Sequence, residues 1–346
     1  MKVLVAGGAG FIGSHLCARL LREGHSVVCV DNLLTGAERN IAPLRQPPTT
    51  PSTTPSTEAS TTVPDARFTF VQRDVTEPLD VARDLEGFRP EAIFQLASPA
   101  SPVGYWNFPF ETIRVNTIGT TQLLELAQTC GARLLTASTS ESYGDPLVHP
   151  QREDYYGNVN PIGVRACYDE SKRLGETITM EYVRRKGVDA RIVRIFNTYG
   201  PHSQLNDGRM IPNFITQALA HRPVTIHGAG AQTRSICYVE DLVEGLLRAL
   251  FTERTTGEVY NLGNPEEHSI KEWAQRIIAL CDSPSELVFE PKREDDPERR
   301  RPNIDKARTQ LGWEPRVAPE EGLTRTIAWF RDEMEREGLC LPARAG

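Results

Sequence analysis

Short, continuous apolar runs alternate with longer amphipathic stretches up to about residue 197 of the chain. Continuous apolar runs are typical of strands in a parallel sheet that is covered on both faces. They predict strands at residues 3–6, 27–30, 68–72, 92–96, 133–138 and 190–195. Apolar positions at helical spacing predict helices at residues 11–23, 116–130 and 168–186. Strands that alternate with helices indicate right-handed crossovers, and therefore an α/β fold with a Rossmann-type doubly wound parallel sheet.

The pattern changes after about residue 197, where helices, turns and short strands mix. Here the same criteria predict a strand at residues 224–227 and helices at residues 211–221, 239–250 and 270–281. We therefore expect a doubly wound domain over residues 1–196 and mainly a smaller C-terminal lobe over residues 197–346. We also expect the chain to return to the first domain around residues 224–262.

Residues 46–64 interrupt the first domain with a segment rich in Pro, Thr and Ser. Such a segment cannot bury enough apolar surface to offset the entropy of ordering its chain. We predict a disordered surface insertion here, because the α/β pattern resumes directly after it.

Composition excludes several classes of protein. The net charge of −7 argues against a nucleic-acid binder, which needs a basic face for the phosphate backbone. The seven Cys are widely spaced and form no C-x-x-C motif, so we expect neither disulfides nor a metal site. That cysteine usage, together with a start that lacks a signal-peptide pattern, predicts a cytoplasmic protein. No apolar run is long enough for a membrane span.

A glycine-rich turn joins the first predicted strand to the first predicted helix. Its pattern is G-x-x-G-x-x-G, with Gly7, Gly10 and Gly13 at the three fixed positions. Such glycines permit a tight turn and a close approach of backbone to a pyrophosphate, which then lies at a helix N-terminus. Asp31 ends the second strand, where an acid can bind a ribose 2′-hydroxyl and repel a 2′-phosphate, so NAD is favoured over NADP. The alternative for Asp31 is a turn cap.

Tyr168 and Lys172 lie four residues apart in a predicted helix, and therefore on one of its faces. A cation beside a phenol stabilises the phenolate, which can accept a proton from a hydroxyl group as hydride leaves. Without the glycine-rich turn, the pair would be interpreted as solvated surface residues.

With both motifs present, the sequence resembles the extended short-chain dehydrogenase/reductase family of nucleotide-sugar epimerases, dehydratases and decarboxylases. The resemblance runs from about residue 1 to 330 apart from the insertion, and includes the segments 96–98, 138–144 and 194–201. It implies an NAD-binding first domain and a lobe that binds a nucleotide sugar. The implied cofactor contacts are Gly7, Gly10, Phe11, Ile12, Gly13, Asp31, Asn32, Asp74, Val75, Leu96, Ala97, Ser98, Asn116, Tyr168 and Lys172.

Finer detail resembles the UDP-glucuronate decarboxylases within this family. The segments that carry this likeness are residues 97–102, 138–141, 160–163, 165–170, 206–209, 295–297 and 300–302. A 4,6-dehydratase would carry an Asp where this chain has Ser140, and 4-epimerases usually lack an acid at the position of Glu141. A 4-epimerase, a 4,6-dehydratase and a non-catalytic NAD-binding regulator are the alternatives, and UDP or dTDP as the nucleotide stays open.

The resemblance also implies roles for individual residues. Thr139 would bind the reacting oxygen of the sugar while Tyr168, assisted by Lys172, deprotonates the C4 hydroxyl and NAD takes the C4 hydride. Ser140 and Glu141 would orient the sugar carboxylate and the sugar ring. Arg300 would supply or orient the proton for C5, although Arg seldom releases a proton. The implied substrate contacts are Tyr105, Asn197, Asn213, Arg234 and Arg300.

Simpler interpretations exist for three of these: Asn197 as a turn cap, Arg234 paired with Glu240, and residues 299–301 as a solvated charge run. Helices 116–130 and 168–186 pair between subunits in this family, which implies a homodimer with a four-helix bundle.

Overall fold

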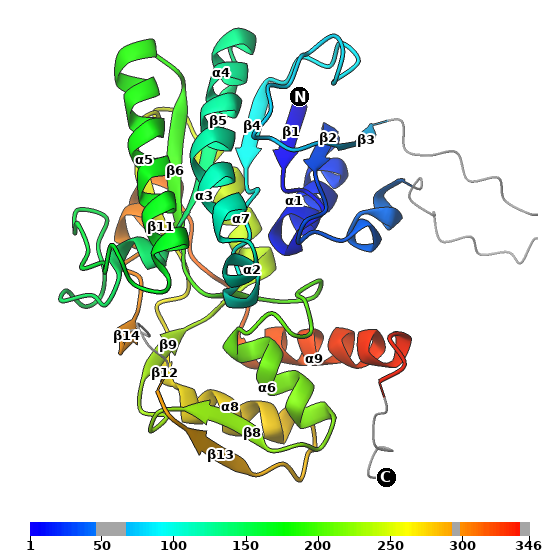
Figure 1. Ribbon diagram of the computed structural model, residues 1–346, viewed down its shortest axis with the longest axis vertical. Helices are drawn as coiled ribbons and strands as arrows, with labels where there is room; N and C mark the ends of the chain where they lie inside the picture. Colours follow the sequence, from blue (N-terminus) through cyan, green and yellow to red (C-terminus); the bar gives the residue numbers. More distant parts are fainter. Residues whose placement is uncertain (46–66, 293–297, 340–346) are drawn as a thin grey trace, which may run out of the picture.

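The computed structural model describes residues 1–45, 67–292 and 298–339. At its centre is a parallel sheet in the spatial order β3–β2–β1–β4–β5–β6–β11 (Figure 1). Its strands are β1 (Lys2–Ala6), β2 (Ser26–Asp31), β3 (Phe68–Gln72), β4 (Ala92–Gln95), β5 (Arg133–Thr139), β6 (Ala190–Ile195) and β11 (Val259–Leu262). This order confirms the Rossmann-type α/β fold. The direction of winding reverses between β1 and β4, which is where such sheets bind ligands.

Helices cover both faces of the sheet, as the continuous apolar strands require. Alternate residues of β1 enter different cores: Val3 and Val5 pack with α1 (Phe11–Arg22) and α7 (Val239–Phe251). Leu4 and Ala6 pack on the other face, with α4 (Thr120–Cys130). The long helix α5 (Ala166–Lys186) lies beside α4 and against β5 and β6. The central strand β1 is therefore buried on both sides, which explains its continuous apolar run from Val3 to Ala6.

The first helix ends where the sequence predicts. Gly24 follows the last turn of α1 in the left-handed region, with φ +84°. Its N–H donates to the Leu21 carbonyl at 3.0 Å, and the His25 N–H donates to the Leu20 carbonyl at 3.0 Å. This pair of hydrogen bonds is a Schellman cap, and it directs the chain into β2.

The helix predicted to begin at Asn116 begins earlier. Helical structure starts with α3 (Pro109–Arg114), continues through a π-helical turn at Val115–Gly119 and runs on into α4. Phe110 and Ile113 are exposed, so the first turns show no buried apolar face from which the sequence could have revealed them.

The smaller lobe lies beyond the carboxyl ends of the strands (Figure 1). It contains α6 (Met210–Leu219), α8 (Ile270–Leu280) and α9 (Pro319–Arg336), with β8 (Val224–His227) paired to β13 (Leu287–Glu290). A second small sheet places β9 (Thr233–Ser235) between β12 (Glu267–Ser269) and β14 (Arg299–Arg300). Two short strands, β7 (Thr198–Tyr199) and β10 (Cys237–Tyr238), pair near the junction. Of the stretch 224–262, α7 packs on the main sheet and β11 joins it, whereas β8 belongs to the lobe.

The predicted insertion at residues 46–64 falls outside the described residues. Among the residues that are described, no helix combines the length and the apolar character needed to cross a bilayer.

Candidate active site

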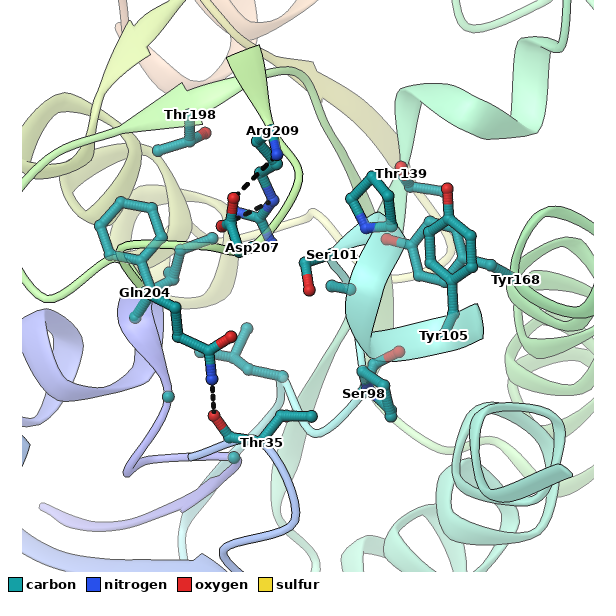
Figure 2. A pocket seen from close by; sticks show the side chains of 18 of the residues that line it. Thr35, Ser98, Ser101, Tyr105, Thr139, Tyr168, Thr198, Gln204, Asp207 and Arg209 are labelled. Atoms are coloured by element: carbon teal, nitrogen blue, oxygen red, sulfur yellow. Dashed lines mark hydrogen bonds and ion pairs between the residues drawn. The ribbon is translucent and has the colours of Figure 1, made fainter. Parts of the chain in front are cut away.

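A cavity of about 900 Å³ lies between the carboxyl ends of the sheet strands and the smaller lobe. Apart from Asn116, every residue that the sequence places in a cofactor or substrate site lines this cavity. The fold therefore brings together segments from the first turn of the chain, the N-terminal end of α5 and the late strand β14. Figure 2 shows part of this wall, with Tyr105, Thr139 and Tyr168 grouped on one side and Asp207 and Arg209 on the other.

The glycine turn leaves room that side chains would fill. Gly7 has φ +78°, and a Cβ there would lie 2.6 Å from the Ala97 backbone nitrogen. A Cβ at Gly13 would lie 2.1 Å from the Gly7 oxygen, so α1 could not approach the turn so closely. At Gly10 a Cβ would meet only the Gly7 oxygen, at 3.2 Å. The cavity is thus open directly above the start of α1, which fits the diphosphate of a dinucleotide.

Asp31 both caps a turn and faces the cavity, so the two interpretations of this residue are compatible. Its carboxylate accepts hydrogen bonds from the Leu33 N–H at 2.8 Å and the Ala9 N–H at 3.0 Å. Burial raises the pKa of Asp31, while these two hydrogen bonds lower it. Beside it, Asn32 donates to Asp74 at 3.0 Å, which fixes a second carboxylate of the cavity wall. This acidic edge fits a ribose with free hydroxyls and disfavours one that carries a phosphate.

Asn116 lies behind the cavity wall instead of on it. It is buried in the π-helical turn, and its Nδ2 donates to the Ser171 hydroxyl at 2.9 Å. Because Ser171 precedes Lys172 on α5, this contact helps to fix the face of α5 that carries the predicted catalytic pair.

Tyr168, Lys172 and Thr139 form a buried group in the wall of the cavity. Figure 2 shows Tyr168 and Thr139 near each other. Burial raises the pKa of Tyr168 to about 12, although a hydrogen bond with the Thr139 side chain lowers it. Burial lowers the pKa of Lys172 to about 7, and its Nζ donates to the Ala137 carbonyl at 2.8 Å. Lys172 Nζ lies 5.9 Å from the centre of the Tyr168 ring. The Lys172 amino group is therefore held beside the phenol, where its ammonium form stabilises a phenolate.

Tyr105, from α2 (Pro102–Asn107), stacks on Tyr168 with ring centroids 5.2 Å apart and an interplanar angle of 15°. Its hydroxyl is buried and has no hydrogen-bond partner among the described residues. The stacked rings fix the orientation of Tyr168 and leave one polar atom for a ligand.

Glu141 lies in a short 3₁₀ turn (Ser140–Tyr143) directly after β5. The Thr139 hydroxyl accepts the Glu141 N–H at 3.2 Å, which sets the start of this turn. Arg300 holds the Glu141 carboxylate with two hydrogen bonds, of 2.5 and 2.7 Å, and Arg165 reaches the same carboxylate at 2.7 Å. Burial alone would raise the pKa of Glu141, but Arg165 and Arg300 lower it to about 2. Glu141 is therefore a permanent carboxylate, clamped by two cations.

The late strand β14 supplies Arg300 to this cluster. β14 pairs in parallel with β9, which places Arg300 directly beside Arg234. Both arginines are buried, so Arg300 is not part of a solvated charge run. Glu240, the alternative partner suggested for Arg234, contacts Arg325 at 3.3 Å. Asn197 and Asn213 also line the cavity, from the junction after β6 and from α6.

The sequence assigned no role to three residues that lie in this wall or directly behind it. Arg165 begins α5 and clamps Glu141, and Arg209 lines the cavity while its backbone N–H donates to Asp207 at 2.9 Å (Figure 2). Asp169 is buried next to Tyr168. Each lies in a segment that carried the family resemblance. The sequence therefore marked these segments, but it did not show which residues these three side chains contact.

Comparison with known proteins agrees with this arrangement. The model of the NAD dependent epimerase/dehydratase family matches residues 3–263. The chain belongs to this family. Membership confirms the resemblance seen in the sequence, and NAD is the cofactor of the family.

Curated relatives are similar over almost the whole chain. UDP-glucuronic acid decarboxylase 1 from Danio rerio is 48% identical over 336 residues, which cover 97% of this chain and 74% of that protein. UDP-glucuronic acid decarboxylase 6 from Arabidopsis thaliana is 47% identical over 332 residues, covering 96% of this chain and 89% of the relative.

Solved structures of epimerases share the architecture. The UDP-glucose 4-epimerase from Thermotoga maritima with UDP-glucose has a TM-score of 0.84 at 28% identity. The UDP-glucuronic acid 4-epimerase from Bacillus cereus in complex with UDP-glucuronic acid and NAD has a TM-score of 0.82 at 28% identity. Each match covers 96% of this chain and 100% of the solved chain.

Proposed function

We propose that this chain decarboxylates UDP-glucuronate to UDP-xylose through a 4-keto intermediate, with NAD regenerated in each cycle. The observation that carries this proposal is the buried carboxylate of Glu141, clamped by Arg165 and Arg300 beside the Tyr168–Lys172 pair. The names of relatives that are 48% and 47% identical support the same reaction.

The first step is oxidation at C4 of the sugar. Bound NAD supplies a hydride acceptor and, after decarboxylation, a hydride donor. Tyr168 accepts the proton of the C4 hydroxyl, since the Lys172 ammonium and the Thr139 hydroxyl stabilise its phenolate. Proton and hydride leave the same C–O–H unit, and a C4 ketone remains.

The ketone makes the next bond cleavage easy, because a carboxylate β to a carbonyl leaves as CO₂ while the carbonyl accepts the electron pair. The resulting enolate must be stabilised and then protonated at C5. Ser140 and Glu141 orient the ring and its carboxylate, and Arg300 lies beside them as an electrostatic and water-orienting group. Since Arg300 binds Glu141 with both terminal nitrogens, it acts as a fixed cation. Tyr168 then returns its proton to the C4 oxygen as the ketone is reduced.

Cationic and amide side chains that line the cavity anchor the substrate. Arg234 has the planar fork that suits a diphosphate, and Asn197 and Asn213 lie where they can donate to the diphosphate or the uracil. The Tyr105 hydroxyl would contact the predicted glucuronate, because the Tyr105 ring stacks on Tyr168 in the cavity wall. Cytoplasmic location stays a prediction; the six described cysteines are all free.

A 4-epimerase is the alternative with the best structural support, since the Bacillus cereus UDP-glucuronic acid 4-epimerase has the same fold. Both reactions share the C4 oxidation, and they differ in what the site does with the keto acid. A 4,6-dehydratase needs an acid where this chain has Ser140. A non-catalytic regulator would not need the buried Tyr168–Lys172 pair.

The proposal predicts the products of a single assay. Purified protein incubated with UDP-glucuronate and NAD should release CO₂ and form one UDP-pentose per CO₂, without net accumulation of NADH. Products are measured by trapped CO₂ and by mass of the nucleotide sugar. Formation of an unchanged-mass isomer would instead indicate a 4-epimerase, and loss of water would indicate a dehydratase.

We also propose a homodimer built from α3, α4 and α5. These helices lie side by side on one face of the sheet (Figure 1). Their outer surface carries apolar side chains that a monomer would leave in water, with Phe110 74% and Leu174 50% exposed, and with Ile113 and Ile118 also exposed. Exposed apolar side chains of this kind are typical of a protein–protein interface. Because α3 and α4 form one continuous helix, two copies packed through this helix and α5 would form a four-helix bundle.

The dimer proposal predicts a shift in assembly after a single substitution. Leu174→Glu should convert the dimer to a monomer, because it places two carboxylates in the apolar interface. Molar mass from light scattering checks this. Leu280→Glu is the matched control, since Leu280 is exposed on α8 of the smaller lobe, and it should leave the mass unchanged. A monomeric wild type, or a dimeric Leu174→Glu variant, would contradict this interface.

A further inference from the structure

The ion pair between Glu141 and Arg300 joins two short segments that are far apart in the chain. Glu141 lies in the four-residue 3₁₀ turn Ser140–Tyr143, and Arg300 lies in the two-residue strand β14. Arg300 nevertheless binds the Glu141 carboxylate with two hydrogen bonds, of 2.5 and 2.7 Å. A two-bond contact of this kind requires its partners to be held to within about 0.5 Å. A group that bonds to both segments would provide this precision.

Asn261 of β11 is bonded to both segments, and its side chain is completely buried. Its Oδ1 accepts a hydrogen bond from the hydroxyl of Tyr143, the last residue of the 3₁₀ turn, at 2.8 Å. Its Nδ2 donates to the carbonyl of Gln151 at 3.1 Å and to the carbonyl of Asn303, just after β14, at 3.2 Å. One amide group therefore connects the turn that carries Glu141 with the chain around β14.

Gln151 continues the connection to the backbone of β14 and is also completely buried. It forms an isolated β-bridge with Pro302. The Gln151 N–H donates to the Arg301 carbonyl at 2.9 Å, and the Gln151 Oε1 accepts the Arg301 N–H at 2.8 Å. The Asn303 N–H in turn donates to the Gln151 carbonyl at 2.8 Å. Because Arg301 directly follows Arg300, these bonds fix the backbone from which the Arg300 side chain extends.

The hydroxyl of Tyr143 determines how the amide of Asn261 is oriented. Arg194 Nη1 donates to this hydroxyl at 3.0 Å, and Arg194 is itself held by Glu176 at 2.7 Å. Since the hydroxyl accepts from Arg194, its own proton is directed to Asn261. The amide must then present its oxygen to Tyr143 and its nitrogen to the two carbonyls on the other side.

This network is fully paired, which restricts it to one arrangement. Asn261 and Gln151 both use the oxygen and the nitrogen of their amides, since Gln151 Nε2 donates to the Val148 carbonyl at 2.9 Å. Apolar side chains in the same places would tolerate small shifts of their neighbours. Buried polar groups lose their partners when a neighbour shifts, so a complete network specifies the relative position of the segments that it joins.

We propose that Asn261 is a positioning residue that fixes the 3₁₀ turn relative to β14 and thereby holds Arg300 against Glu141. Asn261 does not line the cavity, so it acts through this ion pair and not on the substrate. For its effect on the reaction the inference rests on the proposed function, in which Glu141 and Arg300 serve the steps at C5.

The oxidation at C4 should not depend on Asn261. Tyr168 is bonded to the Thr139 side chain and Lys172 to the Ala137 carbonyl, and neither is bonded to Asn261. A variant that moves only the turn and β14 should therefore lose CO₂ release and retain NADH formation. A variant that is merely unstable loses both in the same proportion.

Asn261→Leu keeps the approximate size of the side chain and removes the hydrogen bonds to both segments. We expect its rate of CO₂ release from UDP-glucuronate to fall by about 10²-fold, the effect typical of a small misplacement of reacting groups. Its single-turnover rate of NADH formation should equal that of the wild type. Trapped CO₂ and NADH absorbance are measured on the same preparation of the NAD-loaded enzyme.

Tyr143→Phe is the milder variant and decides the question if Asn261→Leu does not fold. It keeps the aromatic ring and removes only the hydroxyl, so we expect the same selective loss, of roughly tenfold. Tyr260→Phe is the matched control. Tyr260 precedes Asn261 on β11, is completely buried, and donates its hydroxyl to Gln310 at 2.8 Å, outside the network. It should retain both rates.

Urea unfolding tests the same connection without any activity. If Asn261 holds Arg300 against Glu141, the ion pair is already weakened in Asn261→Leu. Glu141→Gln should then destabilise Asn261→Leu, or Tyr143→Phe, less than it destabilises the wild type. In the Tyr260→Phe background its effect should be unchanged, as is usual for independent sites.

The outcomes distinguish this inference from the proposed function. Equal losses of NADH formation and CO₂ release, unchanged rates in the variants, or additive effects on unfolding would each overturn the role of Asn261. If the wild type releases no CO₂ from UDP-glucuronate, the decarboxylase proposal fails and the unfolding measurements alone decide. Non-additive unfolding then supports the positioning role, and additive unfolding overturns it.

Discussion

Tyr168→Phe is expected to reduce both the oxidation of UDP-glucuronate and the release of CO₂ by roughly 10²- to 10⁴-fold. The substitution removes the hydroxyl that accepts the C4 proton, and every later step needs the ketone formed in that step. The fold should not change, because the ring of Tyr168 still stacks on Tyr105. Single-turnover NADH absorbance and trapped CO₂ measure the two losses, which should be equal.

Tyr182→Phe provides the matched control on the same helix. Tyr182 is exposed to solvent at its hydroxyl, which donates to Glu125 at 3.0 Å, far along α5 from the cavity. This variant should keep wild-type rates. If Tyr168→Phe also keeps them, Tyr168 is not the base, and the assignment of the Tyr–Lys pair fails.

Glu141→Gln is expected to lower CO₂ release by about 10²-fold or more while NAD binding changes little. The amide keeps the size of the side chain but removes the charge that holds Arg165 and Arg300 in place. Those arginines would then bind the substrate carboxylate directly. This contact stabilises the carboxylate before it leaves as CO₂ and so slows its release. NAD titration and CO₂ release, measured on the same preparation, separate the two effects.

A fall in stability should accompany this loss. Removing one partner from a buried ion pair costs about 3–5 kcal/mol, and the glutamine oxygen should recover part of this by accepting one hydrogen bond. Urea unfolding checks that the variant is folded under assay conditions. A Glu141→Gln enzyme with the wild-type decarboxylation rate would show that Glu141 has no part in the chemistry.

The sequence was sufficient to predict the sheet and the glycine-rich turn for the cofactor, because both depend on local patterns. The continuous apolar run from Val3 to Ala6 predicts a strand that is buried on both faces of the sheet. Gly7, Gly10 and Gly13 predict the turn that follows it. Gly24 was recognisable as a helix cap for the same reason. Each of these signals lies within a few residues of the feature that it predicts.

The clamp of Arg165 and Arg300 on Glu141 could be predicted only in part, because the three residues are distant in sequence. Arg300 lies 159 residues after Glu141, and their ion pair depends on the pairing of β14 with β9. The resemblance supplied both residues separately, but no sequence pattern showed that they touch. Arg165 was missed as a functional residue for the same reason, because the burial and charge around it follow from tertiary packing. Asn116 shows the converse, since it was predicted as a cofactor contact but its side chain binds Ser171 of α5.

The position of Arg300 in the chain separates it from the residues that carry out the oxidation. The family model matches residues 3–263, whereas β14 lies at residues 299–300. The common region therefore contains the whole redox apparatus, from Gly7 to the Tyr168–Lys172 pair. Arg300, which completes the clamp on Glu141, lies after these residues in the chain. A substitution confined to β14 should therefore change the surroundings of Glu141 without altering the residues of the redox apparatus.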